Sequence, residues 1–370
     1  MAQEISSEDY ALVGLSLIRG LGPHKIRLLL KAFGSADATL GRPASDLLRI
    51  PGIGAKLAKA ITRFSSLEPC RRQFEAASSV GAYFVRSESR TYPGLLREIF
   101  DPPPFLWMIQ SDSFVWQTPV AIVGTRKPSS YGRHVTSKVA GALSERGITV
   151  VSGLAHGIDA AAHKTVVLQG GRTVAFLGSG LDKIYPRNHR RLAKEIVEQG
   201  CLISSFPFGT EPDATNFPQR NRLISGSSHA TIVTEAYVRG GALITARFAL
   251  DQNREVLAIP GPVTSPASEG ANKLIQDGTA RLMLTAEDIL GELIPAARPG
   301  HIDSGLFRTL NPTISQADKN VLEALDYTPR HLDEICEDAR CNVSQALDSL
   351  LNLEFAGCIQ NCGGNLYARL

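Results

Sequence analysis

The chain has 370 residues, of which 43% are hydrophobic and 20% are charged, with 33 Gly and 21 Pro. These values exclude collagen, coiled-coil and disordered proteins, and the length predicts two or three domains at ~100–200 residues each. No apolar run reaches the ~18 residues of a membrane helix, and the first ten residues are too polar for a signal peptide. Six Cys are too few for a disulfide scaffold, so we expect a cytoplasmic protein with no membrane span.

The small net charge of +3 hides an uneven distribution along the chain. Residues 1–116 contain 14 Lys+Arg against 11 Asp+Glu, and residues 117–290 contain 19 against 14. Residues 291–370 contain only 6 against 11. A basic body with an acidic tail indicates a polyanionic partner for the first two blocks.

The first block holds two copies of one pattern, at residues 18–26 and 50–57, in which glycines flank an apolar residue before a Lys-bearing helix. This pattern predicts a helix-hairpin-helix, SAM-like domain over residues 1–80, whose backbone N–H groups could hold a DNA phosphate. A helical bundle that uses the glycines only for tight turns explains the pattern equally well.

The middle of the chain alternates apolar β-branched runs with helical patterns. The expected strands are Val120–Val123, Thr149–Val151, Thr173–Leu177, Leu202–Ile203, Ala230–Val233 and Glu255–Ile259. Such alternation predicts an α/β fold, an extended Rossmann-like doubly wound sheet over residues 81–292. Ligands of these sheets bind at the carboxyl ends of the strands.

Residues 293–315 are rich in Pro, Gly and Ser and predict a linker, and residues 316–370 predict three helices and a hairpin, as in a winged helix. The expected recognition helix, Val343–Glu354, contains no Lys or Arg. We therefore expect this acidic domain to serve a regulatory or protein-partner role rather than to hold DNA. Four cysteines there could bind zinc, but their spacings favour simple packing.

The loops after the expected strands carry phosphate-binding features. The candidate residues are Gly124, Thr125, Arg126, Gly153, Lys183, Tyr185, Arg220, Asn221, Arg222, Gly240 and Gly241. Neither the dinucleotide fingerprint nor a P-loop occurs, and no loop offers a nucleophile beside a base, so no cofactor and no catalytic residue are expected. His156, Asp159 and His163 could share a helix face, but capping explains them better than a metal does.

Residues ~95–290 resemble the DNA-processing protein A (DprA/Smf) family. Seven segments carry the resemblance in order: Val123–Arg126, Ser152–His163, Asp182–Pro186, Phe217–Pro218, Arg220–Gly226, Glu235–Ala236 and Ala258–Gly261. The helical N-terminal block and the winged helix are accessory domains known in longer members.

The resemblance implies a non-enzymatic protein that binds and protects incoming or processed single-stranded DNA. It also implies dimerisation through the Rossmann domain and help in loading the RecA-type recombinase during natural transformation. By the family pattern, Arg126, Lys183, Arg220 and Arg222 would contact DNA, while Gly124, Thr125 and Asn221 shape the pocket. Ala242 stands where members often have Ser, which removes a hydroxyl donor.

Two other interpretations of the sequence compete with a single-stranded DNA-binding protein. A phosphoribohydrolase-like enzyme with a related Rossmann core would need a Pro and a Glu that are missing around Arg239–Thr245. A scaffold that binds no DNA is the third interpretation, and a gel shift with a labelled oligonucleotide would separate it from the first.

Overall fold

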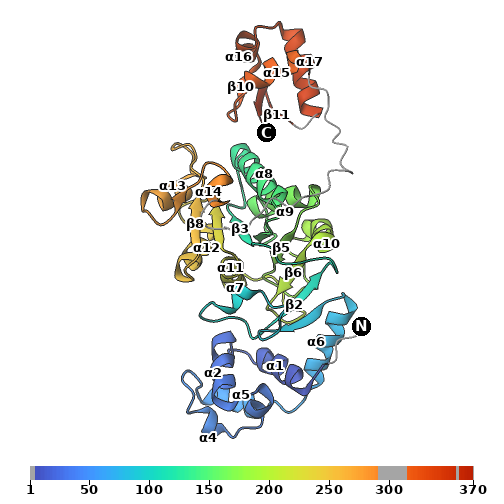
Figure 1. The fold of residues 1–370 in the computed structure, drawn as a ribbon, viewed down its shortest axis with the longest axis vertical. Helices are drawn as coiled ribbons and strands as arrows, with labels where there is room; N and C mark the ends of the chain where they lie inside the picture. Colours follow the sequence, from blue (N-terminus) through green and yellow to red (C-terminus); the bar gives the residue numbers. More distant parts are fainter. Residues whose placement is uncertain (1–4, 291–314, 356–357, 370) are drawn as a thin grey trace.

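The computed structural model describes residues 5–290, 315–355 and 358–369. Figure 1 shows a helical N-terminal part, a central α/β part and a small C-terminal domain, arranged in chain order along the longest axis. Within these ranges, no helix is both long and apolar enough to cross a membrane. The three-part α/β fold expected from the sequence is confirmed.

The N-terminal part is entirely helical, and tight glycine turns lie before two of its helices. Its helices are α1 (Ser7–Leu17), α2 (Pro23–Phe33), α3 (Ala36–Leu40), α4 (Ala44–Leu47), α5 (Ala55–Thr62) and α6 (Glu68–Ser79). Ser6 and Asp9 form a capping box at the start of α1, which satisfies backbone N–H groups that the helix leaves open. Gly20 (φ +89°) and Gly52 (φ +80°) adopt the left-handed conformation in the turns before α2 and α5.

The central sheet has nine strands among the described residues, in the order β1-β2-β6-β5-β4-β3-β7-β8-β9. From β6 to β9 neighbouring strands are parallel, whereas β1 and β2 extend the sheet in antiparallel fashion. The strands are β1 (Tyr83–Arg86), β2 (Phe105–Gln110), β3 (Val120–Val123), β4 (Val150–Ser152), β5 (Thr173–Phe176), β6 (Cys201–Ser204), β7 (Ala230–Val233), β8 (Glu255–Ala258) and β9 (Arg281–Leu282).

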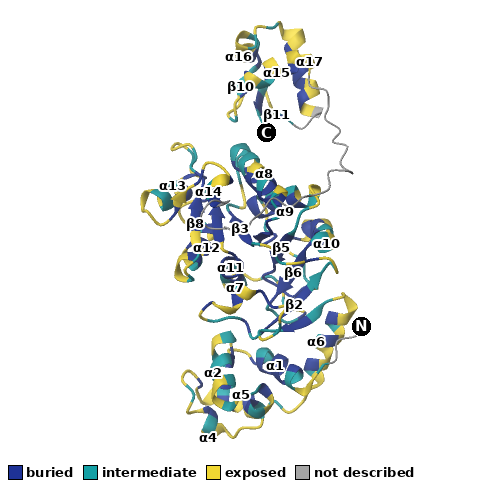
Figure 2. Ribbon diagram, in the orientation of Figure 1, coloured by how far each residue is buried: buried dark blue, intermediate teal, exposed yellow. Residues whose placement is uncertain are grey.

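Helices cover both faces of this sheet, so its central strands are buried throughout (Figure 2). The helices are α7 (Gly94–Arg97), α8 (Ser130–Glu145), α9 (Ile158–Leu168), α10 (Arg190–Gln199), α11 (Asn216–Gly226), α12 (Gly241–Asp251), α13 (Glu269–Gln276) and α14 (Glu287–Leu290), with a 3-10 turn at Arg187–His189. All six strands expected from the sequence are present as β3 to β8. The strands β1 and β2 were not expected because they precede the regular strand–helix alternation, and β9 was not expected because it has only two residues, both exposed.

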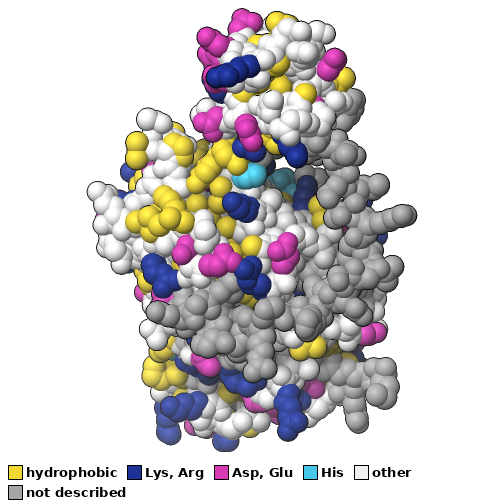
Figure 3. Space-filling view, turned by 45° about the horizontal axis from the view of Figure 1, so that its top comes forward, with side chains coloured by type: hydrophobic (Ala, Val, Ile, Leu, Met, Phe, Trp, Pro, Cys, Tyr) yellow, Lys and Arg dark blue, Asp and Glu magenta, His cyan; other side chains and the backbone are white. Residues whose placement is uncertain are grey.

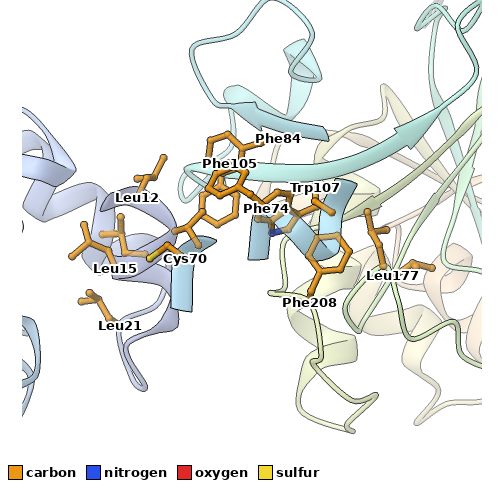
Figure 4. Close-up of a cluster of buried hydrophobic side chains, with 14 of the residues drawn as sticks. Leu12, Leu15, Leu21, Cys70, Phe74, Phe84, Phe105, Trp107, Leu177 and Phe208 are labelled. Atoms are coloured by element: carbon orange, nitrogen blue, oxygen red, sulfur yellow. The ribbon is translucent and has the colours of Figure 1, made fainter. Parts of the chain in front are cut away.

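A single hydrophobic cluster joins the N-terminal helices to the sheet (Figure 4). The Trp107 ring of β2 lies 5.2 Å, between ring centroids, from each of Phe74 on α6, Phe84 on β1 and Phe208. A charged contact reinforces this junction, with the Arg86 Nε 2.5 Å from the Asp9 carboxylate. Burial of several aromatic rings across the boundary stabilises the two parts as one packed body.

The C-terminal domain has the winged-helix arrangement of helices followed by a hairpin. Its elements are α15 (Gln316–Glu323), β10 (Arg330–His331), α16 (Leu332–Asp338), α17 (Val343–Phe355), β11 (Ile359–Gly363) and β12 (Leu366–Arg369). The strand β10 adds to the expected hairpin and gives a three-stranded sheet in the order β10-β12-β11. Almost all of the expected linker lies outside the described residues.

A small set of side chains on α8 contacts the C-terminal domain. The Tyr327 ring centroid lies 4.8 Å from that of His134 and 6.1 Å from that of Tyr131. The Gln360 side-chain amide donates a 2.8 Å hydrogen bond to the Ser130 hydroxyl. The winged helix therefore lies beside the N-terminal half of α8.

Candidate functional site

An open pocket of about 650 Å³ lies at the carboxyl edge of the sheet. Its walls come from the loops after β3, β4, β5 and β7 and from the start of α11 and α12. The chain moves from β3 through β4, β5 and β6 in one direction and then returns to β7 on the other side of β3. The pocket therefore lies at the topological switch point of the sheet, where doubly wound folds bind their ligands.

The loop Gly124–Arg126 forms one wall of the pocket and is fixed by its backbone. A Cβ at Gly124 would overlap the Ile158 side chain, so only glycine fits between β3 and α9. The Thr125 N–H donates a 2.7 Å hydrogen bond to the Glu235 carbonyl at the end of β7. This geometry places the exposed Arg126 side chain at the mouth of the pocket.

The Glu235 side chain also holds the segment that follows Arg126. It is buried, and its carboxylate accepts hydrogen bonds from the Ser129 N–H (2.9 Å) and hydroxyl (2.5 Å). The Ser129 hydroxyl in turn caps α8 by accepting from the Gly132 N–H. Glu235 therefore has a positioning role that sequence analysis missed, although a lone acid directly after a buried strand was an available signal.

The Phe217 ring on α11 lines the pocket, and sequence analysis did not name it as a site residue. The Arg126 guanidinium lies 4.8 Å from its ring centroid, and the Arg220 guanidinium lies 5.7 Å from it. The ring of Tyr185, which is exposed, is 5.9 Å away between centroids. Aromatic faces and a guanidinium thus meet at one place, which suits stacking and cation–π contacts.

Lys183 lies outside the residues that line this pocket and is already paired. Its Nζ is 3.0 Å from a carboxylate oxygen of Glu211, and this hydrogen bond raises the pKa of Lys183. Sequence analysis placed Lys183 among the phosphate contacts but missed Glu211, because the two residues are 28 positions apart on different loops. An anion at this position has to displace the carboxylate.

Arg220 lines the pocket but is buried there. The residue is 3% exposed, and its Nη1 donates to the carbonyl oxygens of Gly153 and Phe176 (2.6 Å to Phe176). Burial lowers the pKa of Arg220 to about 10, while the charge of Asp159 opposes this shift. Gly153 is required because a Cβ there would overlap the guanidinium. Arg220 therefore holds the loops after β4 and β5, and a direct phosphate contact by Arg220 stays a prediction.

Arg222 points away from the pocket. Its Nη1 donates to the backbone carbonyl (2.7 Å) and to the carboxylate (2.8 Å) of Asp101, and its side chain is 12% exposed. Residues i and i+2 of a helix do not share a face, which explains why α11 separates Arg222 from Arg220. Arg222 therefore does not line this pocket, and its expected contact with DNA stays a prediction.

The remaining expected residues, Asn221, Gly240 and Gly241, do line the pocket. The Asn221 side chain accepts a 3.1 Å hydrogen bond from the Arg220 Nε and lies 3.5 Å from the Gly241 carbonyl. Gly240 is the N-cap of α12, so this wall offers backbone N–H groups at a helix start. No atom lies within 4 Å of a Cβ built at Gly241, so the space there would admit a side chain.

The polar residues after β4 stabilise the fold and do not form a metal site. Asp159 accepts hydrogen bonds from the N–H groups of Gly153 (3.2 Å) and Ala155 (3.3 Å). His163 is buried, with its Nδ1 2.7 Å from the Thr173 hydroxyl. Among the residues the structure describes, no group of three His, Cys, Asp or Glu could hold a metal, and this includes the described C-terminal cysteines.

The two N-terminal hairpins lie on a different part of the molecule from this pocket. The Lys25 Nζ donates a 3.3 Å hydrogen bond to the Gly20 carbonyl, and Lys56 and Lys59 are exposed beside the second hairpin. Figure 3 shows that Lys and Arg side chains gather on this N-terminal part, at the bottom of the view. Phosphate binding by the hairpins stays a prediction.

Fold and pocket together define a three-part α/β protein with a Rossmann-like sheet and a pocket at the carboxyl edge of that sheet, lined by Arg126 and Arg220. The chain belongs to the DNA recombination-mediator protein A family, whose model matches residues 83–294. The DprA winged-helix model matches residues 308–365, and the SAM-like helix-hairpin-helix tandem matches residues 14–64.

Curated relatives and solved structures agree with this family. Protein Smf of Synechocystis sp. is 34% identical over 98% of this chain and 99% of its own length. DNA processing protein DprA of Bacillus subtilis is 38% identical over 77% of this chain and 96% of its own. The crystal structure of DNA processing protein A from Streptococcus pneumoniae aligns with a TM-score of 0.68 at 31% identity, covering 78% of this chain and 99% of that one.

A second solved structure is that of DNA processing protein A from Helicobacter pylori, whose title describes its single-stranded DNA binding mode. It aligns with a TM-score of 0.51 at 26% identity and covers 57% of this chain and 99% of that one.

Proposed function

We propose that this protein binds the sugar–phosphate backbone of single-stranded DNA. The site is the pocket at the carboxyl edge of the sheet, which we call the strand-end pocket. The observation that carries the proposal is the arrangement of Arg126, Phe217 and Tyr185 at the mouth of that pocket. Single-stranded DNA sites combine cations that follow the phosphates with aromatic rings on which bases stack, and both are present here. The DNA-binding relative from Helicobacter pylori supports the same ligand.

The pocket supports binding better than catalysis. The ionisable side chains that line it are Arg126, Asp159, Tyr185 and Arg220. Asp159 is buried and accepts two backbone hydrogen bonds, so it serves the loop. The neighbouring Ser152 hydroxyl is buried and donates to the Ile122 carbonyl (2.6 Å), so it too serves the fold. We therefore infer a binding protein without enzymatic activity. Incubation with a nucleoside monophosphate, followed by assay for free base, tests the phosphoribohydrolase alternative, and release of base would contradict this inference.

The family description of a recombination mediator supports a further part of the proposal, in which the bound strand is protected and passed to a RecA-type recombinase in the cytoplasm. A homodimer through the Rossmann domain belongs to the same proposal. It is supported by the apolar edge beside β9, where Val263, Leu282 and Leu284 are exposed. Sedimentation of wild type against Leu284→Glu tests the dimer, which the variant should weaken.

The proposed division of the chain is residues 1–80, 81–292, a linker at 293–315 and 316–370. Because the first two parts share the core around Trp107, we assign DNA binding to them as a unit. Limited proteolysis should release residues 316–370 first and leave the remainder intact.

The direct test of the pocket is Arg126→Ala, with Lys194→Ala on the exposed face of α10 as a matched control. Loss of one arginine contact to a phosphate should weaken single-strand binding by ~1–3 kcal/mol with little sequence preference. Fluorescence anisotropy with a labelled oligonucleotide measures this change. Wild-type affinity in Arg126→Ala would refute the pocket as the DNA site.

A further inference from the structure

A second hollow runs between α8 and α9 and meets the strand-end pocket at Arg126. This groove has a volume of about 750 Å³. It is lined by Arg126, Lys127, Pro128, Arg133, Ser137, His156, Gly157, Ala160, Ala161, Lys164, Thr165, Leu168 and His189. Arg126 and His156 also line hollows of the strand-end site, so the two regions are continuous.

The charged side chains that line the groove are all cationic. Four exposed cations line it, namely Arg126, Lys127, Arg133 and Lys164, and no Asp or Glu does. Within the described part of the chain, none of the four forms an ion pair. Lys183 at the rim of the strand-end pocket differs, since Glu211 neutralises it. Unpaired like charges in one concave surface repel each other until an anion occupies it.

The two helices arrange these cations along a path. Arg133 and Ser137 are one turn apart on α8, and Lys164 and Leu168 are one turn apart on α9. Lys164 lies six residues beyond the start of α9 at Ile158, which is about 9 Å along the helix axis. Leu168 is 82% exposed at the far end of the groove. The path thus leads away from the pocket and ends on an exposed apolar side chain.

We propose that the α8–α9 groove binds the continuation of the strand held in the strand-end pocket, with successive phosphates at Arg133 and Lys164. This inference rests on the proposed function, because the groove is assigned to the same DNA molecule. The pocket and the groove share Arg126, so one flexible single strand can pass from the first to the second. Leu168 offers an apolar contact to a base where the DNA strand leaves the groove.

The test compares two oligothymidylates, one of about 6 and one of about 20 nucleotides, which bracket the ~4–16 nucleotides typical of single-strand sites. The variants are Arg133→Ala and Lys164→Ala in the full chain. The control is Lys138→Ala, an exposed α8 lysine that does not line the groove. Anisotropy titrations over a range of salt concentrations give the affinity and its salt dependence.

Each variant should weaken binding of the long oligonucleotide by about five-fold at 0.1 M salt and reduce the salt slope by about 0.7, the value for one phosphate on a single strand. Binding of the short oligonucleotide should be unchanged. Unchanged binding of both lengths, or equal loss for both, would contradict DNA binding in the groove. Neither result would contradict DNA binding in the strand-end pocket. Failure of the wild-type protein to bind either length would instead overturn the proposed function.

Discussion

Lys183 and Glu211 form an ion pair at the rim of the strand-end pocket, with 3.0 Å between Nζ and the carboxylate. Because a phosphate has to replace Glu211, we expect Lys183→Ala to reduce single-strand affinity less than Arg126→Ala does. Glu211→Gln should increase affinity, up to about five-fold at 0.1 M salt, since it frees one cation for the DNA. Parallel anisotropy titrations of the three variants measure this order, and weaker binding by Glu211→Gln would contradict it.

We expect Arg220 to act through the loops that it holds rather than through the ligand. Its guanidinium bonds the carbonyls of Gly153 and Phe176, and its charge faces the buried Asp159. Arg220→Ala leaves buried acceptors and a buried carboxylate without their partner, so the free energy of unfolding should fall by roughly 3–5 kcal/mol. Urea denaturation measures this loss, with Arg191→Ala on an exposed helix face as the control. A fully stable Arg220→Ala protein that no longer binds DNA would instead identify Arg220 as a direct contact.

Contacts of individual side chains were the feature of the structure that the sequence predicted least well. Arginine is almost always exposed, so nothing in Arg220–Asn221–Arg222 indicated that one guanidinium would be buried. That burial depends on the space left at Gly153 and on the charge of Asp159, which come from another loop. The pairing of Lys183 with Glu211 is likewise a tertiary contact without a local signal.

At the scale of single elements, α9 is fixed to the sheet by His163. The Thr173 hydroxyl donates to the Val150 carbonyl, so it accepts its second hydrogen bond from the His163 Nδ1–H. The Nε2 atom is buried without a partner. Burial, together with the charges of Arg220 and His189, lowers the pKa of His163 from 6.5 to about 3.

This lowered pKa predicts a specific pH dependence. Between pH 6.5 and about 3 the unfolded chain binds a proton at His163 that the folded protein does not, so stability is lost as pH falls through this window. The contribution is roughly 1 kcal/mol per pH unit. Urea denaturation of wild type and His163→Gln between pH 4.5 and 6.5 measures it. The slope should be shallower in the variant, and equal slopes would contradict the assignment.

Strands and helices were more predictable than the site. The run Val120–Val123 is β3 as expected, because only a strand covered on both faces is continuously apolar and β-branched. The strands β1 and β2 were missed because they extend the sheet in antiparallel fashion before the alternation begins. Their aromatic residues, such as Trp107, serve the junction with the N-terminal helices.

At the scale of the whole molecule, the acidic winged helix lies beside the basic groove. The Ser130 hydroxyl accepts hydrogen bonds from Gln360 of the winged helix (2.8 Å) and from Arg133 of the groove (3.4 Å). Figure 3 shows acidic side chains on the C-terminal domain at the top of the view. The helix α17 contains Asp348 and Glu354 but no Lys or Arg, so this domain provides little attraction for a polyanion.

Deletion of residues after Ser315 should therefore leave single-strand affinity unchanged or slightly increased, most clearly at low salt. The reason is that like-charge repulsion acts within a Debye length of ~8 Å at physiological salt and over longer distances at lower salt. Tyr327→Ala, which removes the aromatic contact with α8, is the matched variant in the full chain. A loss of tenfold or more on deletion, ~1.4 kcal/mol, in a folded protein would show that the winged helix holds DNA.

Binding of the single-stranded DNA backbone by the Rossmann-like part is the proposal on which the other DNA-binding predictions depend. Titration of the wild-type chain with matched single- and double-stranded oligonucleotides at two salt concentrations tests it most directly. We expect tighter binding of the single strand, little dependence on base sequence, and a salt slope of about −0.7 for each phosphate contacted. Preference for the duplex, or affinity that does not change with salt, would contradict it.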